Sequence, residues 1–289
     1  MNPWLVLKRD YGQLGNRLHT HANALAFAIE HNLNFLNLSF TESAKDFSRQ
    51  NYTTHDRYLP QASILGRFLS SSKIVSLLQR LSLSDRLLGK LGGRLKVIER
   101  KDDETISEQD LFNELKSSNS VRIFLLRAWD VNCPQALEKH ATQIRERLAP
   151  SSETKKIVLN LLGSIPPDGL LVGLHVRRRD YAKWLGGLHY HSWEQYGEWL
   201  NQTHNILLRQ GHKPTYLLCS DESPPSDIFS SLPIIVGQRS PMTDLYALAS
   251  CKLVLGPPSS FGSWASFYGE VPRLVLKAGD TVTNIPCIS

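Results

Sequence analysis

Three consecutive arginines and a carboxylate follow an apolar segment near the middle of the chain. Residues 170–176 are mostly aliphatic, and Arg177, Arg178, Arg179 and Asp180 come directly after them. Guanidinium groups bind phosphate oxygens through parallel hydrogen bonds, and parallel sheets bind ligands beyond the carboxyl ends of their strands. The run therefore predicts a diphosphate site at the end of a buried strand. The alternative is that the arginines coat a solvated turn.

Two later apolar segments end in residues that suit the same ligand. Residues 215–219 read as a buried strand, and Asp221 follows them, either bonding to a nucleotide or closing an Asx turn. Residues 253–256 read as another strand, whose following loop enters a helix at Ser259, Ser260 and Phe261. Unpaired N–H groups at the start of a helix form a cradle for phosphate. Because the carboxyl ends of parallel strands meet at one edge of a sheet, we expect these groups to converge.

A glycine-containing loop near the amino terminus could also present backbone N–H groups to an anion. Residues 4–8 read as a strand, residues 16–31 as a helix and residues 35–38 as a second strand. The loop has the spacing G-x-x-G-N, with Gly12 and Gly15, and not the G-x-G-x-x-G of dinucleotide-binding loops. An ordinary tight turn therefore remains an alternative.

The pattern of strands and helices predicts an α/β protein of two domains. Residues 121–126 read as the last strand of the first domain, and helical spacing follows over residues 136–148 and 153–163. Proline, serine and glycine punctuate residues 149–169, so we place the boundary there, with domains 1–155 and 156–289. Residues 39–60 look like a loop and residues 61–92 like two short amphipathic helices, which we assign to the acceptor side.

Composition excludes several classes of protein. Of 289 residues, 41% are hydrophobic and 21% charged, the mean hydropathy is −0.25, and no long uncharged apolar run could span a membrane. The net charge of +6 suits an anionic ligand but falls short of the dense basic stripe of a nucleic-acid-binding protein. No signal peptide is evident, so we expect a cytoplasmic protein. The four cysteines are widely spaced, which indicates reduced structural thiols.

Neither of two candidate metal sites has a complete ligand set. Residues 102–104 are acidic but have no histidine beside them, and His189 and His191 lack a third ligand. We therefore expect no metal. Paired glycines and aromatic residues between Tyr181 and His191 predict a mobile loop that excludes water from the site.

Three ordered motifs resemble those of one enzyme family. The run H-V-R-R-R-D-Y from His175 to Tyr181 resembles the H-x-R-R-G-D-Y signature of the α1,2-/α1,6-/protein O-fucosyltransferase superfamily. The run D-L-Y-A-L-A-S-C-K-L-V-L-G-P-P-S-S-F-G-S-W, which starts at Asp244, resembles a second motif of the family, and G-Q-L-G-N-R, which starts at Gly12, resembles a third. The resemblance covers about two thirds of the chain. Arg179 stands where many members have glycine.

The resemblance implies a B-type glycosyltransferase fold, with two Rossmann-like domains facing a cleft. It implies an inverting, metal-independent transfer of fucose from GDP-fucose to a hydroxyl group of a glycan or other acceptor, with no cofactor besides the donor, by a bacterial cytosolic member. Transfer from another nucleotide sugar, or a non-catalytic module that binds a nucleotide or glycan, remains an alternative.

The resemblance also implies roles for individual residues. Arg177, and after it Arg178, would stabilise the charge that builds on the β-phosphate, and Asp180 would orient an arginine. The residues expected to bind the nucleotide sugar are Gly12, Gly15, Asn16, Arg17, His175, Arg177, Arg178, Asp180, Asp221, Asp244, Ser259, Ser260 and Phe261. His175 would lie near guanine, with a core histidine as the alternative. The candidates for the base that activates the acceptor are Asp10, His19 and His189.

Overall fold

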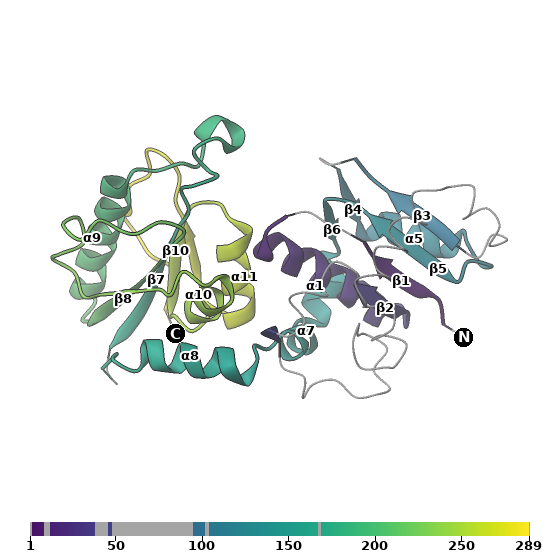
Figure 1. The fold of residues 1–289 in the computed structure, drawn as a ribbon, viewed down its shortest axis with the longest axis horizontal. Helices are drawn as coiled ribbons and strands as arrows, with labels where there is room; N and C mark the ends of the chain where they lie inside the picture. The colour runs from purple at the N-terminus through teal and green to yellow at the C-terminus, as the bar shows by residue number, and fades with distance from the viewer. Residues whose placement is uncertain are drawn as a thin grey trace. The chain divides into compact units, whose positions relative to one another are not determined.

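The computed structural model describes residues 2–8, 12–37, 46–47, 95–101, 104–166 and 169–288. The chain divides into two compact units, residues 1–151 and 152–289, and each contains a parallel sheet (Figure 1). The boundary expected after residue 155 falls inside helix α8 (Ser152–Leu162). The two helices expected over residues 61–92, and most of the loop expected over residues 39–60, lie outside the described residues.

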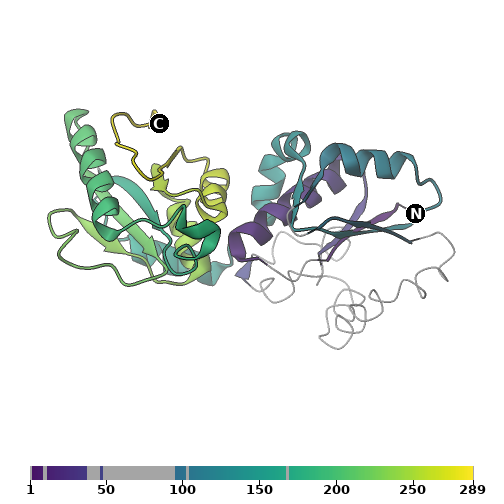
Figure 2. The same ribbon diagram turned by 90° about the horizontal axis from the view of Figure 1, so that it is seen from above.

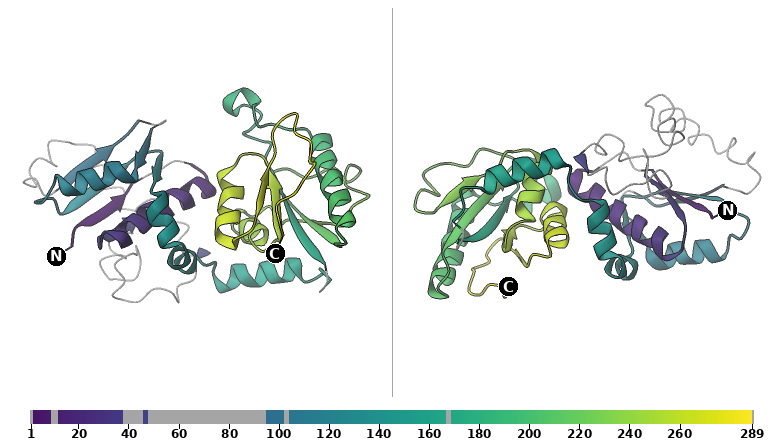
Figure 3. Two further views of the ribbon diagram at one scale, coloured as in Figure 1. Left: turned by 180° about the vertical axis from the view of Figure 1, so that it is seen from behind. Right: turned by 90° about the horizontal axis from the view of Figure 1, so that it is seen from below.

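The first unit contains a four-stranded parallel sheet of order β2-β1-β5-β3. Its strands are β1 (Trp4–Leu7), β2 (Asn34–Asn37), β3 (Leu95–Glu99) and β5 (Ile123–Arg127). A smaller parallel pair joins β4 (Thr105–Ser107) to β6 (Asp130–Asn132). The helices that the structure describes in this unit are α1 (Leu14–Glu30), α5 (Glu108–Lys116), α6 (Pro134–Lys139) and α7 (Ala141–Arg147), and they lie on one side of the four-stranded sheet (Figures 2 and 3).

Helix α1 fixes the first unit because it is buried along most of its length. Small alanine side chains let it approach the sheet closely, and Phe35 of β2 meets the ring of His21 with 5.2 Å between ring centroids. Asn37 donates from its amide to Nδ1 of His21 at 2.9 Å, and burial lowers the pKa of His21 to about 3. The imidazole is therefore neutral at pH 7, which lets it accept this bond.

The second unit contains a five-stranded parallel sheet of order β11-β10-β7-β8-β9. Its strands are β7 (Leu170–Val176), β8 (Pro214–Ser220), β9 (Ile234–Val236), β10 (Leu253–Gly256) and β11 (Arg273–Val275). Its helices, besides α8, are α9 (Trp193–Arg209), α10 (Pro241–Leu248), α11 (Ser260–Gly269) and the short 3-10 segment η5 (Trp184–Gly187).

The central strand β7 is buried on both faces, as its apolar sequence predicts. Val172, Leu174 and Val176 belong to a core cluster with residues of α9 and the carboxyl-terminal segment, which run together on that side of the sheet (Figure 2). The opposite face meets α10 and the turn after it, where a Cβ on Gly173 would lie 2.6 Å from Leu248. Two apolar layers therefore hold the end of β7 in place.

The predicted α/β class is confirmed, and the elements that differ are short. Strands β3, β4, β6 and β11 were not expected; the last three have only three residues each, too short for an alternating pattern to show. The last strand expected in the first domain, residues 121–126, is followed by β6. The single helix expected over residues 136–148 is two helices that meet at His140, whose ring bonds to Glu30 of α1.

Candidate functional site

The order of the strands in the second unit defines a candidate ligand site. The chain leaves β7 toward β8 and β9 on one side, and it returns to β10 and β11 on the other. The direction of winding therefore reverses between β7 and β10, which are paired neighbours. Open α/β sheets bind ligands beyond the carboxyl ends of the strands at such a point. Here these ends carry Arg177 and the loop that leads to Ser259.

The ends of β7 and β10 approach closely because Gly256 closes β10. This residue has a φ of 156°, and a Cβ there would lie 2.5 Å from the carbonyl oxygen of His175. A side chain would force the strands apart at this point. Glycine thus lets the loop after β10 lie directly against the last residues of β7.

His175 joins the two strand ends. Its Nε2 lies 3.2 Å from Oγ of Ser259, and its ring stacks on Phe261 with 4.9 Å between centroids. Burial lowers the pKa of His175 to about 3, and the positive charges of Arg177 and Arg273 act in the same direction. A neutral imidazole in these contacts serves as a structural link and can still border a ligand.

Arg177 is oriented by the carboxylate three residues later. Its Nε and Nη2 donate to the two oxygens of Asp180 at 2.8 and 2.6 Å, and these bonds lower the pKa of Asp180. The guanidinium carbon lies 5.3 Å from the centroid of the Tyr181 ring. An arginine has five N–H groups, so this pairing leaves three for a ligand. Asp180 was expected to orient an arginine, and it binds Arg177 in this way.

Arg178 is held by the protein on every side. Its Nε donates to Glu222 at 2.9 Å, Nη1 to the carbonyl oxygen of His191 at 2.5 Å, and Nη2 to the hydroxyl of Tyr190 at 2.5 Å. The guanidinium also lies over the rings of Tyr190 and Trp193. These contacts use three of its five N–H groups and leave two, against three on Arg177, so Arg178 is the better suited of the two to fixing the loop that carries Arg177.

Asp221 fixes the backbone of the same loop from β8. One of its oxygens accepts the N–H of Arg178 at 3.0 Å, and the other accepts that of Arg179 at 3.2 Å. The side chain of Arg179 is exposed. Asp221 therefore holds the backbone after β7 and does not close an Asx turn in its own segment, and its expected role toward the nucleotide remains a prediction.

The loop after β10 enters α11 with the features of an anion cradle. Ser259 is the N-cap, and its Oγ accepts the N–H of Phe261 at 3.1 Å. Ser260 and Phe261 form the first turn of this ten-residue helix, which has no acidic residue there. Tyr181 donates to the carbonyl oxygen of Pro258 at 2.8 Å, which attaches the loop to the segment after β7. Ser259, Ser260, Phe261 and Arg177 therefore share one edge of the sheet.

Asp244 lies near the start of α10 and is buried. Its Oδ1 accepts the N–H of Gln238 at 2.8 Å, and burial raises its pKa to about 6. The carboxyl group closes the loop between β9 and α10. No contact in the described part of the structure joins it to His175 or Ser259, so its expected role toward the nucleotide remains a prediction from the resemblance.

The residues expected to bind from the first unit surround the start of α1. Gly12 has a φ of 92°, and its carbonyl oxygen accepts a bond from Nε of Arg17 at 2.8 Å. Gly15 is buried and Asn16 half-buried in the first turn of the helix. The structure thus shows a tight turn that leads into a helix amino terminus. The expectation that these four residues close over the donor remains a prediction.

The candidates for the base lie in three different settings. Asp10 lies outside the described residues. His19 belongs to α1, in the first unit. His189 belongs to the second unit, where its ring lies 5.6 Å from that of Trp184 and its buried Nδ1 has no hydrogen-bond partner in the described part of the chain. The structure therefore favours none of them.

Arg273 lies in the same site, and sequence reasoning did not single it out. It begins β11, and its Nη2 donates to the carbonyl oxygen of Pro257 at 2.7 Å. The signal that could have identified it is the apolar run after Pro272, which reads as a strand parallel to β10. Without the register of that pair, nothing in the sequence connects Arg273 with the serines.

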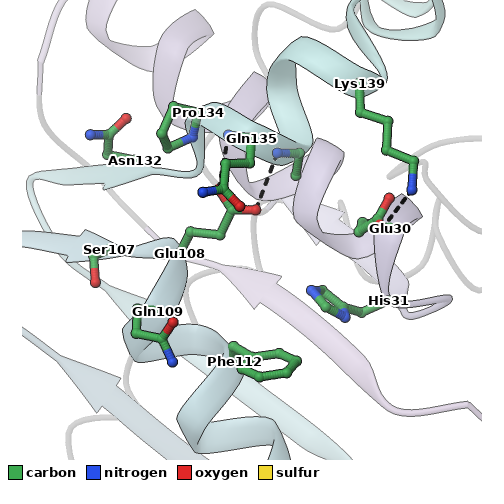
Figure 4. Close-up of a pocket in the computed structure, with 11 residues that line it drawn as sticks. Glu30, His31, Ser107, Glu108, Gln109, Phe112, Asn132, Pro134, Gln135 and Lys139 are labelled. Atoms are coloured by element: carbon green, nitrogen blue, oxygen red, sulfur yellow. Dashed lines mark hydrogen bonds and ion pairs between the residues drawn. The ribbon is translucent and has the colours of Figure 1, made fainter.

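A hollow of about 560 Å³ lies in the first unit, and none of the residues that line it is an expected site residue (Figure 4). Its charged groups are already paired: Glu108 accepts the N–H groups of Gln135 and Ala136, and Glu30 binds Lys139. These contacts join α5, α6 and α1. The hollow thus has the character of a structural junction with internally compensated charge.

Two other features are absent from the residues that the structure describes. In the described part of the chain, no three histidine, cysteine, aspartate or glutamate side chains are grouped so that they could hold a metal ion. Among the same residues, no helix has the length and apolar character needed to cross a membrane.

Comparison with known proteins gives matches in structure alone. No protein-family model matches the sequence, and no curated protein matches it significantly. The fold is similar to that of a mutant of Arabidopsis thaliana FUT1 in complex with GDP, with a TM-score of 0.59 and 11% identity over 96% of this chain and 71% of that one.

Two further fucosyltransferases share the fold over nearly their whole length. POFUT1 in complex with GDP matches with a TM-score of 0.55 and 11% identity, over 96% of this chain and 98% of that one. The fucosyltransferase NodZ from Bradyrhizobium matches with a TM-score of 0.53 and 14% identity, over 100% of this chain and 98% of that one. The structural resemblance to fucosyltransferases and the B-type glycosyltransferase fold are thereby confirmed.

Proposed function

We propose that this protein is an inverting, metal-independent glycosyltransferase that moves fucose from GDP-fucose to a hydroxyl group of a glycan or another acceptor. The observation that carries the proposal is that Arg177 and the start of α11 follow β7 and β10, where the winding of the second sheet reverses, and that His175 and Tyr181 join these two segments. Similarity to solved fucosyltransferase structures, two of them with GDP bound, supports the same donor class.

The proposed chemistry is electrostatic. When the bond between fucose and phosphate breaks, negative charge builds on the β-phosphate of the departing GDP. A guanidinium already oriented in the site stabilises that charge without reorganising during the reaction. Asp180 holds Arg177 along one edge, so the other edge can face the phosphate. Arg178 would act indirectly, because its contacts fix the segment on which Arg177 stands.

The first test is the thermal stability of the protein with a panel of nucleoside diphosphates, measured with and without EDTA. GDP is expected to raise the melting temperature more than UDP, ADP or CDP. Arg177→Ala removes charge-assisted bonds worth about 1.5–3 kcal/mol, so we expect its affinity for GDP to fall roughly 10- to 100-fold. Arg179→Ala, which removes the same charge from an exposed side chain two residues away, is the matched control.

Each result bears on a separate part of the proposal. An equal response to all four diphosphates would reject GDP as the donor nucleotide, and equal GDP affinity of wild type and Arg177→Ala would reject the role of Arg177. Loss of GDP binding in EDTA would reject metal independence. Release of GDP from GDP-fucose, measured with and without candidate acceptors, separates a transferase from a module that only binds.

A further inference from the structure

Arg273 reaches the proposed phosphate site from the neighbouring strand. The residue pairs with Val254 in the register of β10 and β11, and its side chain extends to the carbonyl oxygen of Pro257, just beyond the end of β10. Its guanidinium lies against Gly262 in the first turn of α11. A Cβ on that glycine would lie 3.1 Å from both Nε and Nη2 of Arg273. Because Gly262 has no side chain, the guanidinium of Arg273 has room beside the start of the helix.

The positive charge of Arg273 is not compensated by the described part of the chain. Its Nε is buried without a hydrogen-bond partner, and its Nη2 contacts a neutral carbonyl oxygen and no carboxylate. Burial accordingly lowers the pKa of Arg273. A buried charge without an opposite charge is costly, and proteins usually pair such groups with a carboxylate or with a bound anion.

The surroundings of Arg273 are those of Arg177. Arg273 contacts the carbonyl oxygen of Pro257, while Tyr181, which lies under Arg177, contacts that of Pro258. Both guanidiniums lower the pKa of His175, as charges close to one group do. Two cations therefore flank one short loop, on the side where α11 begins.

We infer that Arg273 is a second anion-binding cation of this site, and that with Arg177 it selects a ligand carrying a diphosphate over one carrying a single phosphate. The inference deepens the proposed function and rests on it for the identity of the nucleotide. Two guanidiniums near the same loop supply the charge that two adjacent phosphates require, and the N–H groups of α11 add to it.

The test compares Arg273→Met with wild type in the binding of inorganic pyrophosphate, GDP, GMP and guanosine, measured by calorimetry. Methionine replaces the guanidinium with an uncharged chain that tolerates a buried setting. We expect the variant to bind pyrophosphate and GDP at least 10-fold more weakly, and guanosine as wild type does. Its melting temperature without ligand should be unchanged or higher, because a buried unpaired charge is gone.

Two further variants keep the test decisive. Arg273→Lys retains the charge without the planar fork and should bind pyrophosphate with intermediate affinity, which gives a readout if the methionine variant does not fold. Arg209→Met removes an exposed arginine from the last turn of α9, which lies at the opposite edge of the sheet, before the start of β8. This control should bind all four ligands as wild type does.

The failure of this inference differs from that of the proposed function. The inference is wrong if Arg273→Met and Arg273→Lys bind pyrophosphate as tightly as wild type does. It is also wrong if their affinities for guanosine and for GDP fall by the same factor. In both cases the proposed donor can stand. Wild type could instead prefer another nucleoside diphosphate while Arg273→Met still binds pyrophosphate more weakly than wild type. The proposed donor is then wrong and the inference holds. Failure of pyrophosphate to bind wild type overturns the inference.

Discussion

The three arginines after β7 are identical in type and differ in what surrounds them. One edge of the Arg177 guanidinium binds Asp180. Arg178 donates hydrogen bonds to Glu222, His191 and Tyr190. The side chain of Arg179 is exposed. The difference arises because successive residues leave the end of a strand in different directions. Of the three, Arg177 combines orientation with unused donors, and for this reason it carries the proposed chemistry.

His175 gives a prediction about pH. Its pKa of about 3 in the folded protein lies below the unfolded value of 6.5, so the unfolded chain binds more protons between these values. Its contribution to stability is therefore complete above pH 6.5 and is lost as the pH falls. Between pH 7 and pH 5 the loss should be about 2 kcal/mol, since each pKa unit corresponds to about 1.4 kcal/mol.

Urea unfolding of wild type and His175→Gln at both pH values measures this contribution. The difference in free energy of unfolding between the two proteins should be about 2 kcal/mol smaller at pH 5 than at pH 7. The contributions of all other titrating groups are the same in both proteins and therefore cancel in this difference. A difference that does not change with pH would contradict the buried neutral imidazole, and NMR titration of the His175 ring gives a direct check.

At the scale of elements, side chains that cap helices and turns determine where the functional loops lie. Ser259 caps α11 and contacts His175, and Asp221 of the β8 end holds the backbone after β7. Ser107 caps α5 in the first unit in the same manner, and Asp110 completes a capping box there. A serine N-cap thus positions the candidate site at α11, whereas at α5 it stabilises only the fold.

This pair of caps provides a matched prediction. Ser259→Ala and Ser107→Ala should each lower the free energy of unfolding by about 1 kcal/mol, the usual cost of losing a serine N-cap. Ser259→Ala should also weaken GDP binding several-fold, whereas Ser107→Ala should leave it unchanged. Denaturation and calorimetry on the two variants measure both effects. Equal GDP affinity in both would argue against Ser259 as part of the donor pocket.

For the whole molecule, the two larger parallel sheets differ in how the chain winds through them. In the second unit the winding reverses once, between β7 and β10, whereas in the first unit β2 lies on one side of β1, and β5 and β3 lie on the other. The sequence motifs follow interior strands of the two sheets: the loop with Gly12 follows β1, and the arginines and serines follow β7 and β10. Topology alone therefore selects the segments in which functional residues can gather.

Hydrogen exchange on the full chain tests this selection. Binding of GDP should slow exchange of the backbone amides over residues 177–181 and 259–262, which follow β7 and β10. Amides over residues 163–166 and 210–213, at the opposite edge of the second sheet, should exchange as before. Protection confined to the opposite edge would mean that the nucleotide binds elsewhere, and the topological argument would then be wrong.

The sequence by itself determined the α/β class, the central strand and the motifs that suggest a diphosphate. These depend on local apolar periodicity and on the order of residues along the chain, and both are visible in one dimension. Short strands such as β11 were missed because three residues hold no period.

Only the tertiary structure decided which polar groups meet. It placed Ser259 against His175, committed Arg178 to internal contacts, turned Asp221 toward the backbone after β7, and brought Arg273 to the site. Each of these contacts depends on strand order and register, which pack residues that lie far apart along the chain. Burial then sets the charge of His175, because the cost of charging a side chain depends on what surrounds it in three dimensions.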